Sequence, residues 1–219
     1  MTDFALARRN MIDGQLRPNR VTNDRLLAAV GDLPRERFLP EQMRAVAYAD
    51  DDVPLGNGRY LMEPMVLARL IQTLQPKPQD RALVVGSGRG YGAALMSRLV
   101  MSVVAVESDA LLAAVAQQTA KELGIERVKQ VIGPMEAGAA DSGPYDVILI
   151  EGAVRLVPDS IVAQLAEGGR LTTVLGGPPG ALGVAQLFMK QGGVTSGRAL
   201  FETGTPLLPG FAPPPRFTF

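Results

Sequence analysis

The feature that most constrains this chain is a glycine-rich loop between a strand pattern and a helix pattern. Residues 81–85 form a short apolar run typical of a buried strand, and residues 91–99 have a helical pattern. Between them lies the sequence Val-Gly-Ser-Gly-Arg-Gly-Tyr-Gly. A strand that turns into a helix through glycines is typical of a doubly wound α/β sheet, which binds ligands at the carboxyl ends of its strands. The loop therefore predicts a fold class and the place of a ligand site.

The alternation of strands and helices continues after this loop. Further strands are predicted over residues 102–106, 128–132, 145–150 and 171–175, and helices over residues 109–123, with Asp109 as N-cap, and 160–166. Short apolar runs divided by amphipathic helices favour a mostly parallel sheet with both faces covered. Residues 184–189 and 198–202 are expected to complete it as a hairpin.

Residues 1–60 are predicted to form a helical extension and a substrate-side loop. Residues 61–219 are predicted to form the main domain, and the two parts are expected to make one compact unit. Thr22 is the predicted N-cap of a helix that ends before Pro34. Residues 50–58 are expected to be a loop. Their three aspartates lack the spacing of a calcium loop, so no metal is predicted. The proline-rich residues 207–215 are expected to be an extended surface tail.

Composition excludes several classes of function. The 219 residues include no cysteine and no histidine. The chain therefore cannot build a Ser-His-Asp triad, an imidazole base, a thiolate nucleophile or a metal site with these ligands. Lysine plus arginine equals aspartate plus glutamate, at 22 each, so neither nucleic acid nor an anionic membrane is an expected partner. Without a signal-peptide pattern or an apolar run of about 18 residues, the expected location is cytoplasmic. The oligomeric state stays open.

An acidic residue follows the second predicted strand. Glu107 lies 21 residues after Gly86, where a carboxylate can accept hydrogen bonds from both hydroxyls of an adenosine ribose. The alternative is that the glycines only form a tight turn and that Glu107 is a solvated acid. The predicted cofactor-binding residues are Gly86, Ser87, Gly88, Gly90, Tyr91, Glu107 and Ser108.

The spacing of the glycines separates two kinds of cofactor. The dinucleotide fingerprint G-x-G-x-x-G/A needs a small residue three positions after Gly88, where this chain has the bulky Tyr91. The order G-x-G-x-G favours the loop of S-adenosylmethionine-dependent methyltransferases, and a dehydrogenase stays the alternative.

Pieces of the sequence also match a known family in order. They are Gln15-Leu16, Leu-Pro-Arg-Glu-Arg-Phe-Leu-Pro at 33–40, Ala-Tyr-Ala-Asp at 47–50, Pro-Leu-Gly-Asn-Gly at 54–58, Pro64, Gly90-Tyr91, Tyr145-Asp146, Val157-Pro158 and Gln-Leu-Ala-Glu-Gly-Gly-Arg-Leu at 164–171. Over most of residues 9–176 the chain resembles protein-L-isoaspartate O-methyltransferases. The resemblance implies the class I methyltransferase fold, S-adenosyl-L-methionine as cofactor and a protein or peptide substrate carrying an altered aspartate. A carboxylate is ionised at neutral pH, so methylating it needs no histidine base.

The departures from the family pattern lie in the expected site. The family's active-site loop reads Gln-Thr-Ile-Ser-x-Pro, whereas residues 59–64 read Arg-Tyr-Leu-Met-Glu-Pro. Met62 thus replaces the hydroxyl, Val84 replaces an acid before the glycines, and Pro134 replaces an aspartate. Arg59 and Met62 are the predicted residues of the catalytic loop, and Arg59 is expected either to pair with a substrate carboxylate or to be a surface arginine. Two functions stay open: a carboxyl methyltransferase with an altered loop, or a divergent member without repair activity that acts as a binding or scaffold protein.

Overall fold

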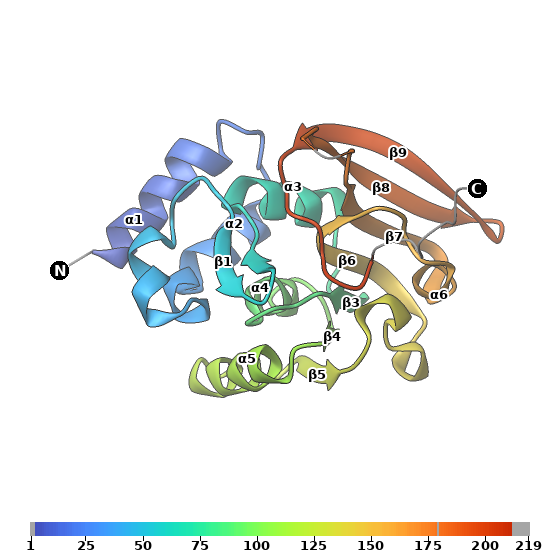
Figure 1. The fold of residues 1–219 in the computed structure, drawn as a ribbon, viewed down its shortest axis with the longest axis horizontal. Coiled ribbons are helices and arrows are strands. Elements are labelled where there is room, and N and C mark those ends of the chain that lie inside the picture. Colours follow the sequence, from blue (N-terminus) through green and yellow to red (C-terminus); the bar gives the residue numbers. More distant parts are fainter. Residues whose placement is uncertain (1–2, 179, 212–219) are drawn as a thin grey trace, which may run out of the picture.

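The computed structural model describes residues 3–178 and 180–211 and contains a seven-stranded sheet flanked by helices (Figure 1). The strand order is β5-β4-β3-β6-β7-β8-β9. Five strands are parallel, namely β3 Arg81–Val85, β4 Ser102–Glu107, β5 Val128–Ile132, β6 Tyr145–Val154 and β7 Leu165–Leu175. Strands β8 Gly183–Gln191 and β9 Val194–Thr203 add an antiparallel hairpin at one edge. The predicted mostly parallel sheet is confirmed.

The helices are α1 Phe4–Met11, α2 Asp24–Asp32, α3 Pro64–Leu74, α4 Tyr91–Ser97, α5 Ala110–Glu122 and α6 Asp159–Val162. Helix α5 has the predicted cap, because the Asp109 carboxylate accepts the amides of Leu111 and Leu112. The cap of α2 is Asn23, not Thr22. The Asn23 side chain accepts the Leu26 amide, whereas the Thr22 amide donates to the side chain of Gln72.

Two predicted helices are too long. The helix expected over residues 160–166 stops at Val162, since the Tyr145 amide donates to the carbonyl of Gln164 and β7 begins at Leu165. Backbone pairing with β6 thus replaces the last helical turn. The helix expected over residues 91–99 stops at Ser97. The predicted strand 171–175 is only the second half of β7.

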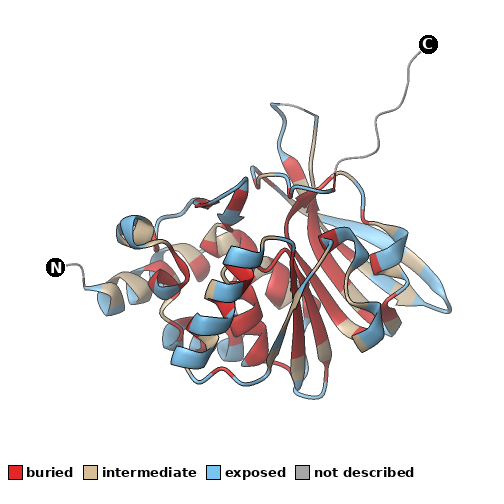
Figure 2. Ribbon diagram, turned by 60° about the horizontal axis from the view of Figure 1, so that its bottom comes forward, coloured by how far each residue is buried: buried red, intermediate tan, exposed pale blue. Residues whose placement is uncertain are grey.

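The sheet separates two apolar clusters, so its central strands are buried on both faces (Figure 2). In β3, Ala82 and Val84 face the cluster under α2, α3 and α4, whereas Leu83 and Val85 face the cluster under α6. The first cluster also contains Phe38 from the N-terminal extension. The extension therefore packs on the same core as the sheet.

The segment expected to be a loop, residues 50–58, contains a strand. Strand β1 Val53–Gly56 pairs antiparallel with β2 Arg59–Leu61, and Asn57 and Gly58 connect them with φ of 50° and 69°. Asn-Gly is the strongest short-range signal for a two-residue hairpin, because both positions need positive φ. Val53, Leu55, Arg59 and Leu61 are buried on one side of this hairpin. The expectation of a loop was therefore wrong.

The expected surface tail is also partly wrong. Residues 212–215 lie outside the described residues, but Leu208 and Phe211 are buried. After β9 the chain turns back and runs beside the end of β6, next to the β1–β2 hairpin (Figure 1). There the Ala153 amide donates to the carbonyl of Pro206 and the Leu208 amide donates to the carbonyl of Ala153. We call residues 205–211 the closing segment.

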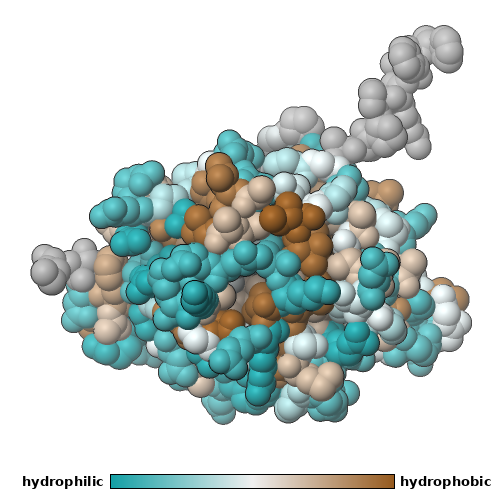
Figure 3. Space-filling view, turned by 90° about the horizontal axis from the view of Figure 1, so that it is seen from below, coloured by the Kyte–Doolittle hydropathy of each residue, from teal (hydrophilic) through white to brown (hydrophobic). Residues whose placement is uncertain are grey.

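The surface seen from below is mainly hydrophilic, with apolar patches between polar side chains (Figure 3). In the part of the chain that the structure describes, no helix is both long and apolar enough to cross a membrane.

Candidate active site

The glycine loop lies at the carboxyl edge of the sheet, where β3 is flanked by β4 and β6. Gly86 and Gly88 have φ of 75° and 53°, a backbone conformation that favours glycine. The amide of Gly86 donates to the carbonyl of Val106 at 2.9 Å, which holds the loop against the end of β4. The predicted strand, turn and helix are present, and they lie where the strand order reverses and doubly wound sheets bind ligands.

Glu107 is the electrostatic centre of this edge. Its side chain is 0 % exposed, so the alternative of a solvated acid was wrong. One carboxylate oxygen, Oε2, accepts the Gly88 amide at 2.7 Å and Arg59 Nη2 at 2.8 Å. The other, Oε1, accepts the amides of Ser108 at 2.9 Å and Asp109 at 3.1 Å. All of the roughly four acceptor positions of the carboxylate are therefore used by the protein itself.

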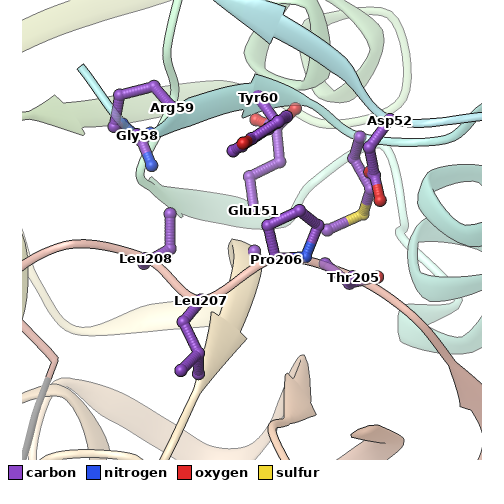
Figure 4. A pocket seen from close by; sticks show the side chains of 11 residues that line it. Asp52, Gly58, Arg59, Tyr60, Glu151, Thr205, Pro206, Leu207 and Leu208 are labelled. Atoms are coloured by element: carbon purple, nitrogen blue, oxygen red, sulfur yellow. The ribbon is translucent and has the colours of Figure 1, made fainter. Parts of the chain in front are cut away.

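Arg59 is not a surface arginine. Its side chain is 2 % exposed, and it lines a small cavity together with Glu151 and Leu208 (Figure 4). Nη2 donates both to Glu107 and to the carbonyl oxygen of Gly86, the latter at 2.7 Å. Nε and Nη1 are buried without a partner among the described residues. In this conformation the guanidinium is engaged inside the protein with Glu107 and Gly86.

Met62 is fixed by a buried arginine from the N-terminal extension. Arg35 is 0 % exposed, and it donates to the carbonyls of Met62 and Ala47, each at 2.7 Å. Its guanidinium carbon lies 5.1 Å from the ring centroid of Tyr91, which also packs edge-on against Phe38. Burial lowers the pKa of Arg35, with Tyr91 opposing this shift most. The motif at residues 33–40 thus positions the predicted catalytic loop, and Tyr91 packs in the core.

The other predicted residues have local partners. Ser87 is buried, and its hydroxyl accepts a hydrogen bond from Gln130 at 3.2 Å. Gly90 is the N-cap of α4, with φ of 94°. Ser108 is exposed. Their roles toward a cofactor stay predictions.

An acid that was not predicted from the sequence lies at the centre of the site. Glu151, near the end of β6, is 6 % exposed, and its Oε2 has no partner among the described residues. Burial raises its pKa to about 8, and nearby Arg59 and Arg35 oppose this shift. Its carboxylate packs on the backbone of Gly92. A charged residue inside the apolar run 147–154 was the available signal, since an isolated acid in such a strand must be buried.

The three aspartates at residues 50–52 lie next to the predicted catalytic loop, residues 59–64. The Asp52 carboxylate accepts the amide of Glu63 at 2.9 Å. Burial, followed by the charges of Asp50, Asp52 and Asp51, raises the pKa of Glu63 to about 7. Within residues 3–178 and 180–211, no group of three or more metal-ligating side chains occurs.

The cavity next to Arg59, on its Glu151 side, is too small for an adenosyl cofactor in this conformation. The cavity among Arg59, Glu151 and Leu208 measures about 10 Å³, room for about one water molecule. Ligand pockets are usually about 300 to 1,000 Å³. A hollow of about 440 Å³ does exist, but it is lined by the first residues of β3, β4 and β5, at the opposite edge of the sheet.

The protein's own side chains fill the glycine cradle. A Cβ added to Gly88 would lie 2.9 Å from Leu55 Cδ1, and one added to Gly86 would lie 3.1 Å from Leu208 Cδ1 and 3.2 Å from Arg59 Nη2. Side chains from the hairpin and from the closing segment thus occupy the place that the glycines leave open. The backbone of the loop is suited to bind the predicted cofactor, but in this conformation the side chains of Leu55, Leu208 and Arg59 take up the space that the cofactor needs.

Known proteins of one family are similar to this chain in sequence and in structure. Residues 7–203 match the model of the protein-L-isoaspartate(D-aspartate) O-methyltransferase family. A protein-L-isoaspartate O-methyltransferase of Koribacter versatilis is 39% identical over 178 residues, which cover 81% of this chain and 80% of the relative. The enzyme of the same name from Methylorubrum populi is 38% identical over 180 residues, or 82% and 83% of the two chains.

Two solved structures of proteins with this family name are also similar. One has a TM-score of 0.81 at 28% identity, covering 93% of this chain and 67% of the other. The second, from Plasmodium falciparum and in complex with S-adenosyl-L-homocysteine, has a TM-score of 0.75. At 20% identity over 96% of this chain and 100% of the other, it supports the fold alone. With the family model matched over residues 7–203, the chain belongs to the protein-L-isoaspartate(D-aspartate) O-methyltransferase family.

Proposed function

We propose that this chain is an S-adenosyl-L-methionine-dependent methyltransferase that methylates the carboxylate of altered aspartyl residues in proteins or peptides. The observation that carries this proposal is the bond between the glycine loop and Glu107, made by the Gly88 amide at 2.7 Å. It joins the loop that follows β3 to the end of β4 at one edge of the sheet, beside the hairpin that leads to Met62. The family membership supports the same reaction class and the same donor.

The residues divide into two sides of this proposed site. We assign Gly86, Gly88 and Glu107 to the donor and Met62 to the acceptor side, which Arg59 joins once its guanidinium leaves Glu107. An ionised carboxylate needs no general base, so the absence of histidine is compatible with the reaction. Because the cradle is filled in the described conformation, we derive no step of methyl transfer from it. The division into residues 1–60 and 61–219 and the cytoplasmic location stay predictions.

A second function has an observation in its favour. Met62 is 2 % exposed and Val84 is 0 % exposed, so two of the three positions that depart from the family pattern are part of the apolar core. A divergent member that keeps the fold and acts as a binding or scaffold protein would have these features. The filled cradle favours the same alternative.

Transfer of a radiolabelled methyl group from S-adenosyl-L-methionine to an isoaspartyl peptide separates the two functions. We expect transfer to this peptide and none to the same peptide with normal aspartate. Met62→Ser, which restores a hydroxyl, should raise the activity or leave it unchanged. No transfer by either protein, together with no binding of S-adenosyl-L-homocysteine, would leave the scaffold alternative.

A further inference from the structure

We infer that Arg59, Leu55 and Leu208 form a built-in plug that competes with the methyl donor for the glycine loop and Glu107. The inference rests on the proposed function only for the identity of the donor. It follows from the disagreement between a backbone that fits an adenosyl cofactor and side chains that fill its place.

Arg59 competes for the acid itself. Three of the five donors to the Glu107 carboxylate are backbone amides, those of Gly88, Ser108 and Asp109, and the Ser108 hydroxyl adds a longer bond at 3.4 Å; all four belong to the same edge of the sheet. Arg59 Nη2 is the partner that belongs to another element. A ribose hydroxyl that donates to Glu107 must therefore displace the guanidinium, because the acceptor positions are already used.

Leu208 competes for the space over the loop. Its side chain lies between Gly86 and Gly152, so close that a Cβ at Gly152 would stand 2.4 Å from Leu208 Cγ. Beside β6, two backbone hydrogen bonds hold this part of the closing segment: the Ala153 amide donates to the Pro206 carbonyl, and the Leu208 amide donates to the Ala153 carbonyl. Because the segment is not a strand of the seven-stranded sheet, it can open locally at a lower cost than the strands of that sheet, although Leu208 and Phe211 then leave the apolar core.

Leu55 and Arg59 belong to one movable unit. They lie on β1 and β2 of the same two-stranded hairpin, which does not pair with the main sheet. The turn of this hairpin reaches α5 through a hydrogen bond from the Asn57 side chain to Asp109 in an exposed position. The hairpin and the closing segment therefore cover the loop from two sides, and each can move without breaking the seven-stranded sheet.

Calorimetric titration with S-adenosyl-L-homocysteine tests the plug. Leu208→Ala keeps the ion pair of Arg59 and Glu107 and removes the apolar side chain over the glycine loop. Its affinity for S-adenosyl-L-homocysteine should be at least about ten-fold higher than that of the parent, because a larger fraction of the protein is then able to bind. Leu207→Ala is the matched control, because Leu207 is the adjacent residue and is 42% exposed. Its affinity should equal that of the parent.

Arg59→Ala and Tyr60→Ala form a second pair on β2, where Tyr60 is 39% exposed. Arg59→Ala should also bind more tightly, and Tyr60→Ala should not. The inference of a plug is contradicted if both Leu208→Ala and Arg59→Ala bind S-adenosyl-L-homocysteine no more tightly than the parent. It is also contradicted if no variant binds this ligand. Leu208→Ala keeps the test valid if Arg59→Ala does not fold.

Hydrogen exchange gives a readout that is independent of affinity. When S-adenosyl-L-homocysteine binds the parent, the amides of Ala153 and Leu208 should exchange faster, since both lose their partners when the closing segment opens. Unchanged or slower exchange in the complex contradicts the inference. If the variants bind S-adenosyl-L-homocysteine more tightly but no methyl transfer occurs, the proposed function is contradicted and the plug is supported. If methyl transfer occurs but the affinities of the variants are unchanged, the plug is contradicted and the proposed function is supported.

Discussion

The glycine loop and the β1–β2 hairpin meet at Glu107, but they are fixed in different ways. The loop is held by backbone groups, through the pairing of β3 with β4 and through amides that donate to the Glu107 carboxylate. The hairpin is held there by a side chain, Arg59, which leaves two buried nitrogens without a partner among the described residues. Backbone geometry tolerates little change, whereas a side chain can be replaced. The glycines of the loop keep the family pattern, whereas departures occur at side chains on both sides of the site, at Val84 and Pro134 as well as at Met62.

The largest effect should come from removing the group that joins the two regions. Glu107→Ala leaves the Arg59 guanidinium buried without its carboxylate, and it removes the acceptor of three backbone amides. Breaking a buried ion pair in this way costs about 3 to 5 kcal/mol. Urea denaturation of the parent and the variant measures the loss in the free energy of unfolding.

The exposed pair of Arg37 and Glu122 provides the control, since its side chains are 42% and 41% exposed. Glu122→Ala should cost no more than about 1 kcal/mol. A similar small cost for both variants would mean that Glu107 does not hold the loop and the hairpin together.

The second effect is a pH dependence of stability that originates at Glu151. Burial raises the pKa of this carboxyl from 4.5 to about 8 in the folded protein. Between these pH values the Glu151 carboxyl is ionised in the unfolded chain but keeps its proton in the folded protein. The free energy of unfolding therefore falls as the pH rises from about 4.5 toward about 8. Urea denaturation at several pH values should show this decline for the parent and a smaller decline for Glu151→Gln. Glu126→Gln, at an exposed position, should behave like the parent.

The third effect measures how tightly the closing segment sits on β6. Gly152→Ala would place a Cβ 2.4 Å from Leu208 Cγ, whereas Gly124→Ala, at φ of 62°, meets no atom within 4 Å. Both positions have positive φ, so both variants carry backbone strain. The overlap should make Gly152→Ala less stable than Gly124→Ala by about 1 to 3 kcal/mol. It should also make the chain after β9 easier to cleave by a protease. Equal stabilities would show that Leu208 adapts without cost.

The sequence was sufficient for the parts of the fold that local patterns determine. The apolar run at residues 81–85, the glycines after it and the cap at Asp109 are encoded within a few neighbouring residues, and all three are present. The end of α6 was not predictable in this way, because it depends on the pairing of β6 with β7, which brings together residues about 20 positions apart.

The site was predictable only in part for the same reason. The spacing of Gly86 and Glu107 reflects one strand-turn-helix-strand unit. The contact between Arg59 and Glu107 joins residues 48 positions apart, and Leu208 reaches Gly86 from the far end of the chain. No local pattern indicates such a contact. Two signals were present and missed: Asn57-Gly58 for the hairpin and Glu151 as a charge within an apolar strand.

The smallest effect concerns Asp109, which serves both regions at once. Its carboxylate caps α5 and accepts a hydrogen bond from Asn57 of the hairpin turn at 2.8 Å. The bond from Asn57 and the cap bonds lower its pKa, so this contribution to stability is present at neutral pH and is lost as the pH falls through the acid range. Asp109→Ala should cost about 1 kcal/mol, as should Asn23→Ala at the cap of α2.

A double-mutant cycle of Asn57→Ala and Asp109→Ala then tests whether the two regions are coupled here. Residues in direct contact usually show a coupling energy of about 0.5 kcal/mol or more, whereas independent sites add to within about 0.3 to 0.5 kcal/mol. If the two costs add, the hairpin turn moves independently of α5, and Arg59 alone ties the hairpin to the donor side. If they do not add, Asn57 is a second tie, and opening the plug must break it together with the ion pair of Arg59 and Glu107.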